Sequence, residues 1–174
     1  GTQLLIPLSE ELALVKDYFN IQNYRYGGTI QLEIVCDDEY LLQTPIIKFT
    51  LQPIVENAIF HGLEPKGNAG TIRILVHAEP ESPDDHVEII IRDNGVGISQ
   101  EKIAIILTDN QASPSEFFRE IGIANVQKRL QYEFGSQYGI HVESQLNAYT
   151  EMHIVIPANY VNEEKENVQI TNFR

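Results

Sequence analysis

The stretch Val87–Ile98, with the sequence VEIIIRDNGVGI, constrains the fold of this chain more than any other. Its first part is a run of β-branched apolar residues, which predicts a buried strand. The run ends in a carboxylate, Asp93, and Gly95 and Gly97 follow where the chain must turn. Glycines at a strand end let the backbone turn sharply or approach a ligand closely. Taken alone, the pattern indicates a strand and a polar turn whose carboxylate can accept a hydrogen bond.

Two further stretches accompany it, Leu51–Leu63 (LQPIVENAIFHGL) upstream and Ile121–Leu130 (IGIANVQKRL) downstream. In this order, the three stretches resemble the N box, the first glycine box and the second glycine box of the superfamily that holds DNA gyrase, MutL and the sensor histidine kinases. The wording VENAIFHGL and NVQKRL is most similar to the LytS-type histidine kinases. The resemblance covers about Leu8 to Pro157, and three boxes in order are far more specific than one.

The resemblance implies a role for each box residue in binding Mg-ATP. Asp93 accepts a hydrogen bond from the adenine amine, while Gly95 and Gly97 let the backbone pass close to the base. Asn57 is the Mg²⁺ ligand, and an amide oxygen suits this hard cation. Glu56, about 100° away around the same helix, matches the family's proposed general base. The alternative for Glu56 is that it orders water around the metal.

Three more residues are candidates for contact with the phosphates. His61 follows Asn57 by four residues and shares its helix face, so it either contacts a phosphate or caps the helix C-terminus as a cation. Gly122 precedes a helix that we expect to start near Ile123, and such a helix N-terminus binds anions. Asn125 lies one turn into that helix, within reach of a phosphate or of a lid.

Hydrophobic periodicity predicts an α/β fold, a two-layer α+β sandwich with a mixed sheet of about five strands and helices on one face. By resemblance this is a Bergerat-type ATP-binding fold. We expect three parts: a linker helix over residues 1–28, an ATP-binding catalytic domain over residues 29–157, and a polar tail over residues 158–174. The predicted strands centre on residues 30–34, 72–76, 87–93, 140–142 and 152–156. The predicted helices cover residues 9–26, 46–60, 99–107 and 123–134, and residues 108–121 are predicted to be an irregular loop.

Composition limits the possible partners of the chain. The net charge of −13 argues against a nucleic-acid surface or an anionic membrane surface, and it means that a bound nucleotide needs local cations or a metal. Cys36 is the only cysteine, which excludes an intrachain disulfide and fits a reducing compartment. His77, His141 and His153 alternate with apolar strand positions, so we expect them on a solvent-facing side without a metal-ligand cluster.

The resemblance as a whole implies the ATP-binding catalytic domain of a two-component sensor histidine kinase. Such a domain transfers the γ-phosphoryl of Mg-ATP to a histidine. In the family the acceptor histidine stands in a His-Phe context, and no histidine here precedes a phenylalanine, so the resemblance implies that the acceptor lies outside this fragment. The expected partners are ATP or ADP, the protein's own dimerisation and phosphoacceptor region, and a response regulator. We expect the full-length protein to be a homodimer, and this domain to be cytoplasmic in a parent attached to the inner membrane.

Two departures from the family pattern favour a different interpretation. Phe60 stands where the family often has a basic residue, and Glu120 stands where a glycine is usual. A carboxylate near a triphosphate repels it by about 1 kcal/mol if exposed to solvent. The alternative is therefore a docking module of the same fold that binds nucleotide weakly or has no catalytic role.

Overall fold

The computed structural model describes residues 3–107 and 117–160, and for residues 117–121 it describes the backbone only. The two long helices are α1 (Leu8–Arg25) and α4 (Phe117–Phe134), and the short ones are α2 (Gln52–Asn57), its π-helical continuation η2 (Ala58–Leu63), α3 (Gln100–Ile106) and two 3₁₀ turns, Glu39–Gln43 and Glu64–Lys66. The strands are β1 (Leu5–Pro7), β2 (Ile30–Cys36), β3 (Pro45–Ile47), β4 (Gly70–Ala78), β5 (His86–Asp93), β6 (Gly139–Gln145) and β7 (Tyr149–Pro157).

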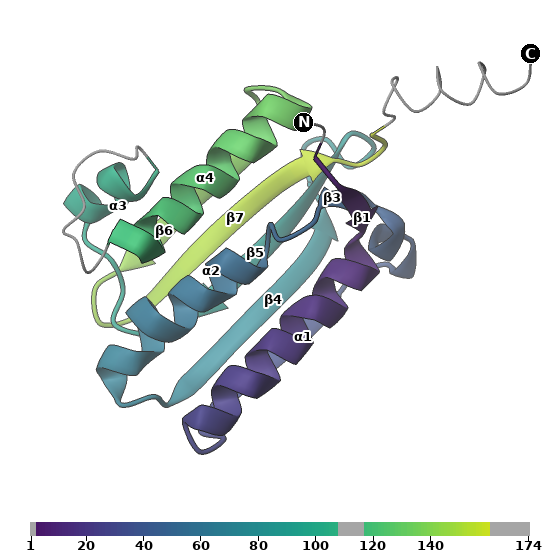
Figure 1. The fold of residues 1–174 in the computed structure, drawn as a ribbon. Helices are drawn as coiled ribbons and strands as arrows, with labels where there is room; N and C mark the ends of the chain where they lie inside the picture. The colour runs from purple at the N-terminus through teal and green to yellow at the C-terminus, as the bar shows by residue number, and fades with distance from the viewer. Residues whose placement is uncertain (1–2, 108–116, 161–174) are drawn as a thin grey trace, which may run out of the picture.

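Five of these strands form one sheet in the order β2-β4-β5-β7-β6. The β2–β4 pair is parallel and the other three pairs are antiparallel, so the sheet is mixed. Helices α1, α2 and α4 lie side by side on one face of this sheet, as Figure 1 shows. The predicted two-layer sandwich with a five-stranded mixed sheet is therefore confirmed.

The core lies between the sheet and these helices, because alternate residues of each central strand point to the same face. Ile74 on β4, Ile89 on β5 and Ile154 on β7 are fully buried, and so are Val15 of α1 and Val126 of α4. The helical spacing predicted for α1 and α4 therefore marks their buried faces. Gly27 and Gly28 come after Tyr26, the residue that follows α1, and have φ angles of 77° and 75°, a left-handed conformation that ends a helix.

The second helix begins later than predicted. Residues 46–51 are not helical, because Pro45–Ile47 forms β3 and pairs with β1 in a separate two-stranded sheet. Phe49 then takes a φ of 66°, which no right-handed helix allows. Helix α2 starts at Gln52, so Pro53 lies in its first turn, where proline is tolerated.

Two other helix starts also differ from prediction. Helix α1 begins at Leu8, one residue before the predicted start, and has no side-chain cap; Leu8 N–H donates to Thr44 O over 2.9 Å. Helix α4 begins at Phe117 and not near Ile123. The rest of the predicted loop, residues 108–116, lies outside the described residues. Helix α3 forms close to its predicted position, and the hydroxyl of Ser99 caps its start by accepting a hydrogen bond from Lys102 N–H.

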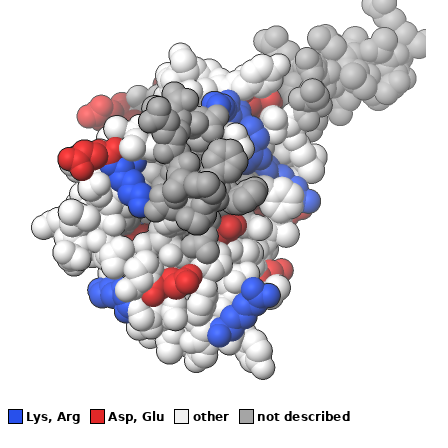
Figure 2. Space-filling view, turned by 60° about the vertical axis from the view of Figure 1, so that its left-hand side comes forward, with Lys and Arg blue, Asp and Glu red and all other residues white. Residues whose placement is uncertain are grey.

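Charge is mixed on the side of the molecule that carries α3. Figure 2 shows Lys and Arg side chains interspersed there with Asp and Glu side chains. Although the chain has more acidic than basic residues, they do not form one uniformly negative surface in this view.

Candidate nucleotide site

The carboxylate of Asp93 lies buried at the end of β5, with 3% of the residue exposed. Its Oδ1 accepts a hydrogen bond from Gly95 N–H over 2.9 Å. A Cβ built on Gly62 would lie 2.6 Å from the same oxygen, so only a glycine fits against this carboxylate. The strand end, the glycine turn and the end of η2 therefore meet at Asp93.

The backbone of Gly95 crosses that of Gly62 in direct contact. Val96 N–H donates to Gly62 O over 2.9 Å. A Cβ on Gly95 would overlap the carbonyl group of Gly62 at well under 3.0 Å. The first glycine box is thus fixed to the end of the N box through the backbone.

Gly97 fixes the other side of the same turn. Its φ is 74°, and a Cβ there would overlap the carbonyl group of Gln145. Ile98 N–H donates to the hydroxyl of Ser144 over 2.7 Å. The turn is therefore held between η2 on one side and the β6–β7 connection on the other.

A cavity of about 270 Å³ opens beside this turn. Small-molecule sites usually have about 300–1,000 Å³, so this cavity is slightly smaller than that range. It brings together three of the residues chosen from the sequence, Asn57, His61 and Gly97. Asn57 is buried, with 6% of the residue exposed. The remaining lining residues are Pro65, Val96, Ile98, Lys102 and Ile106.

Burial raises the pKa of Asp93 from 3.8 to about 6. The Gly95 N–H and the charges of Arg92 and Lys66 oppose this rise but do not cancel it. At neutral pH the buried group is therefore mostly an anion that accepts one backbone hydrogen bond. Its environment favours a ligand that brings another N–H donor.

A larger cavity of about 620 Å³ lies elsewhere, between Tyr40, Pro83 and Tyr160. Val87, at the start of the Val87–Ile98 stretch, lines it, but none of the residues predicted to bind nucleotide does. Residues of the first two stretches, Leu51–Leu63 and Val87–Ile98, instead meet at the smaller cavity.

Comparisons with known proteins agree with this geometry. A family model described as histidine kinase-, DNA gyrase B- and HSP90-like ATPase matches residues 45–160, which is more than half of the chain. The chain belongs to this family.

Relatives within the family are sensor proteins. The sensor protein LytS of Bacillus subtilis (strain 168) is 30% identical over 170 residues, which cover 98% of this chain and 28% of LytS. The sensor histidine kinase YesM of the same organism is 31% identical over 153 residues, covering 88% of this chain and 24% of YesM. The chain thus spans about a quarter of the length of these relatives.

A solved structure shows the same fold. The catalytic domain of histidine kinase ThkA, in a nucleotide-free form, superposes with a TM-score of 0.68 at 18% identity, covering 91% of this chain and 98% of that domain.

Within the described part of this chain, no helix is long and apolar enough to cross a membrane.

The other candidate residues of this family member do not line the cavity. Glu56 adjoins Asn57 and is half-buried, but it does not line the cavity. Asn125 is exposed on α4. Gly122 lies inside α4, so the predicted helix N-terminus at this glycine is wrong; a Cβ there would meet Pro53 at an ordinary 3.5 Å.

Sequence reasoning missed two cations and one hydroxyl near the site. Lys102 lines the cavity from α3, and Lys66 donates to Asn94 O over 2.8 Å, next to Asp93. Thr150 is buried and is the cross-strand partner of Asp93 in the β5–β7 register. The strand alternation predicted β7, but its pairing with β5 cannot be read from one sequence.

The residues present fit an adenine nucleotide and its metal. Gly62, Gly95 and Gly97 let the backbone pack closely around the turn that follows Asp93, and Asn57, whose side chain carries an amide oxygen, lines the cavity beside it. A hard cation such as Mg²⁺ takes oxygen ligands of this kind and keeps several waters.

Proposed function

We propose that this chain is the ATP-binding catalytic domain of a sensor histidine kinase and transfers the γ-phosphoryl of Mg-ATP to a histidine outside it. The buried acceptor Asp93, packed against Gly62 and Gly95 beside a cavity that contains Asn57, carries the proposal. The family match and the sensor relatives support it.

Each side chain has a role that follows from its chemistry. Asp93 accepts a hydrogen bond from the adenine amine, and Asn57 holds Mg²⁺, which neutralises charge on the phosphates. Lys102 and His61, which line the same cavity, meet the phosphate end. Asn125 contacts a phosphate from α4, and Glu56 acts as the general base toward the acceptor imidazole. Positioning and electrostatics supply most of the catalysis in such transfers.

The partners follow from the proposed reaction. The acceptor histidine belongs to the protein's own dimerisation and phosphoacceptor region, and the full-length protein is a homodimer attached to the inner membrane. Histidine kinase ThkA, which shares this fold, has a solved complex with the response regulator TrrA. We infer that a response regulator receives the phosphoryl group here too.

A phosphotransfer assay tests this function. Purified chain is mixed with labelled Mg-ATP, alone or with the separately purified phosphoacceptor region of its parent. Acid-labile, base-stable label is expected on the acceptor region and not on this chain, and Asp93→Asn should reduce it. Label on this chain itself, or none on the folded acceptor region, would contradict the proposal.

The position of Phe60 favours one alternative, a docking module that binds nucleotide weakly. Phe60 packs edge-on against Tyr26, with ring centroids 6.4 Å apart. The side chain that is often basic in the family is therefore used here to contact the end of α1. If the alternative is correct, the assay above yields no label on any protein.

A further inference from the structure

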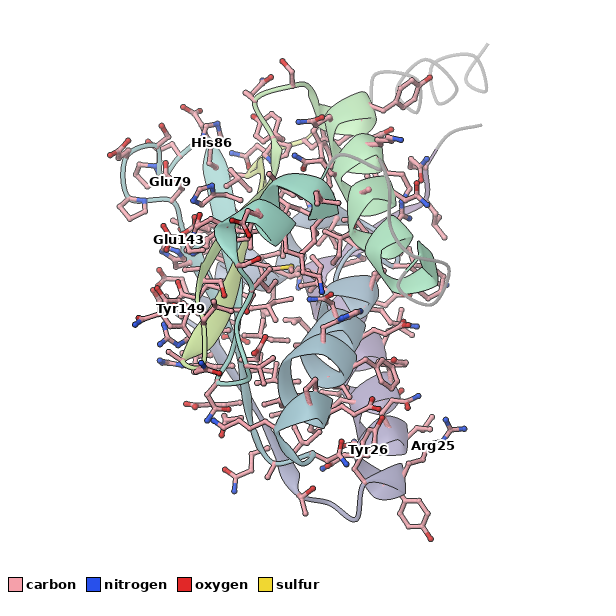
Figure 3. All side chains as sticks on the ribbon, turned by 90° about the vertical axis from the view of Figure 1, so that its left-hand side faces the viewer. Arg25, Tyr26, Glu79, His86, Glu143 and Tyr149 are labelled. Atoms are coloured by element: carbon pink, nitrogen blue, oxygen red, sulfur yellow. The ribbon has the colours of Figure 1, made fainter. Side chains whose placement is uncertain are left out.

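The sheet face that points away from the helices carries a cluster of histidines and glutamates. Figure 3 shows Glu79, His86, Glu143 and Tyr149 on this side, while Arg25 and Tyr26 lie at the end of α1 on the other. The cluster consists of His77, Glu88, Glu143, Glu151 and His153, contributed by strands β4 to β7. Sequence spacing alone shows no metal-ligand cluster here, because only the strand register brings these residues together.

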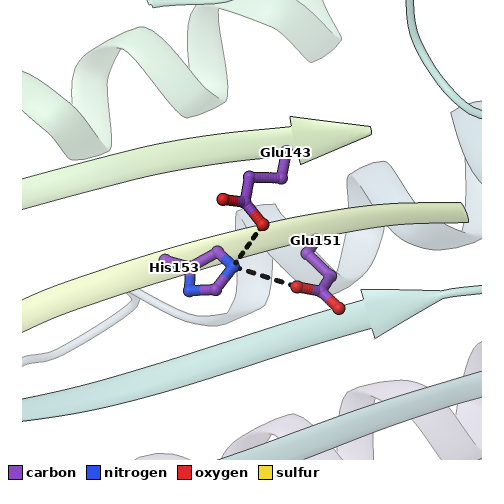
Figure 4. Close-up of side chains that lie close together, drawn as sticks. All are labelled: Glu143, Glu151 and His153. Atoms are coloured by element: carbon purple, nitrogen blue, oxygen red, sulfur yellow. Dashed lines mark hydrogen bonds and ion pairs between the residues drawn. The ribbon is translucent and has the colours of Figure 1, made fainter. Parts of the chain in front are cut away.

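Three side chains converge at one point of this cluster (Figure 4). His153 Nε2 lies 3.0 Å from Glu151 Oε1 and 3.6 Å from Glu143 Oε2. Metal ligands at about 2.0–2.2 Å from a tetrahedral ion lie roughly 3.3 Å from one another. The two distances to His153 Nε2 lie on either side of this value, and the ligand atoms of all three residues lie within 4.8 Å of one another.

The partner of the other ring nitrogen of His153 indicates which kind of ligand can bind between His153 Nε2, Glu143 and Glu151. His153 Nδ1 lies 3.3 Å from Glu88 Oε2, so both ring nitrogens face carboxylates. A neutral imidazole has only one N–H. When Nδ1–H donates a hydrogen bond to Glu88, the lone pair of Nε2 faces the oxygens of Glu151 and Glu143. Three hydrogen-bond acceptors, this nitrogen and the two carboxylate oxygens, then face one another, and only a cation, either a proton or a metal ion, can bind all three.

Glu88 orients this imidazole as outer-shell carboxylates do in metal sites. Its second oxygen lies 2.7 Å from His77 Nε2, which holds the carboxylate in place. The side chains of Glu88 and His153 are only 18% and 15% exposed, so the pair is mostly shielded from water. A carboxylate on the far nitrogen fixes the tautomer and makes the ligating nitrogen more basic.

The charge of the cluster favours a divalent cation over a single proton. Three carboxylates, Glu88, Glu143 and Glu151, face one nearby guanidinium, Arg92, which forms an ion pair with Glu151. Three negative charges and one positive charge leave a formal −2 while the histidines are neutral. His141, whose Nε2 lies 3.6 Å from Glu143 Oε1, is a further titratable group on this side of the site, and the ring of Tyr149 lies under the Arg92 guanidinium.

We propose that His153, Glu143 and Glu151 bind a divalent transition-metal ion of the zinc class. The ligands are His153 Nε2 and one oxygen of each carboxylate, and water completes the coordination. Mixed imidazole and carboxylate ligands suit Zn²⁺ and its neighbours, whereas Mg²⁺ takes oxygen ligands only. The site lies on the opposite face of β5 and β7 from Asp93 and Thr150, so it does not depend on the proposed kinase function.

Zinc titration of the purified chain tests the site. Calorimetry with ZnCl₂ should show one ion per chain, with proton release that appears as a difference between buffers of unlike ionisation enthalpy. Glu143→Gln should weaken binding by about tenfold or more, and Glu88→Gln by about 10–100-fold. An excess of Mg²⁺ should leave the Zn²⁺ affinity unchanged.

A matched control separates this site from ordinary surface binding. His86 also pairs with a glutamate, Glu79, at 3.9 Å, but among residues 3–107 and 117–160 no third ligand accompanies that pair. His86→Gln should therefore bind Zn²⁺ as the wild type does. Glu143 is exposed on β6, so its substitution should not disturb folding. Wild-type affinity in Glu143→Gln, an equal loss in His86→Gln, or no binding by the wild type would overturn the proposal.

Discussion

The buried carboxylate of Glu11 accepts a hydrogen bond over 3.1 Å from the backbone N–H of Leu51, the residue directly before α2. Its other oxygen accepts from Phe49 N–H over 3.0 Å. Glu11 is fully buried, and burial raises its pKa in spite of these hydrogen bonds. One side chain of α1 thereby holds the start of the helix that carries Asn57.

Replacing Glu11 should therefore destabilise the fold. Glu11→Ala leaves two backbone N–H groups without their acceptor, at least one of them buried, so we expect the free energy of unfolding to fall by about 2–3 kcal/mol. Urea unfolding followed by circular dichroism measures this change. Glu10→Ala is the matched control, because Glu10 is exposed in the same turn of α1. This substitution should lower the free energy of unfolding by only about 0.5 kcal/mol. Equal losses in the two variants would show that the hydrogen bonds to α2 contribute nothing.

The raised pKa of Asp93 predicts that the nucleotide-free protein loses stability as the pH rises. The carboxyl has its ordinary pKa of 3.8 in the unfolded chain and about 6 in the fold. Between these values the folded state binds more protons, so the stability of the wild type falls as the pH rises from about 4 to about 6.

Asp93→Asn removes this ionisation and keeps an oxygen for Gly95 N–H. The variant should be more stable than the wild type by up to about 3 kcal/mol at neutral pH, and the difference should shrink toward pH 4. Thermal or urea unfolding across this pH range is the measurement. A difference that does not change with pH would mean that Asp93 ionises as it does in solvent.

Two glycine substitutions should act in opposite directions. Gly95→Ala places a methyl group onto the backbone of Gly62, so we expect a loss of about 2–4 kcal/mol. Gly122→Ala adds a methyl inside α4 at ordinary contact distance from Pro53, so it should stabilise the fold by about 0.5–1 kcal/mol. Urea unfolding curves of the two variants and the wild type measure both changes in stability. Destabilisation by Gly122→Ala would argue against a helix that already runs through this residue.

The sequence predicted the five strands of the main sheet because four of them show the alternation that burial on one face requires, and the fifth, β5, is a run of β-branched apolar residues. It also predicted that Asn57, His61 and Gly97 belong to one site. The failures concern contacts between distant residues. Phe49 takes its left-handed conformation where Glu11 from α1 and Arg129 from α4 bind its backbone, the latter over 3.2 Å to its carbonyl oxygen. Helical spacing over residues 46–51 cannot reveal contacts with those two helices.

Short strands and strand register are the other limits. Strands β1 and β3 have three residues each and both include a proline, so neither shows a usable alternation. The hydrogen bonds of Glu11 in the first turn of α1 also go to another segment, residues 49–51, and local sequence does not reveal such a contact. Likewise, His153 and Glu143 meet only because β6 and β7 pair in one particular register.

Calorimetric titration with ADP and Mg-ATP tests the central claim most directly, because every assigned role depends on a nucleotide beside Asp93. The wild-type chain should bind both nucleotides. Asp93→Asn should bind them about 10–100-fold more weakly, because its amide can present a donor to the adenine amine. A folded wild-type sample that gives no heat with either nucleotide, or an Asp93→Asn variant that binds as tightly as the wild type, would contradict this account.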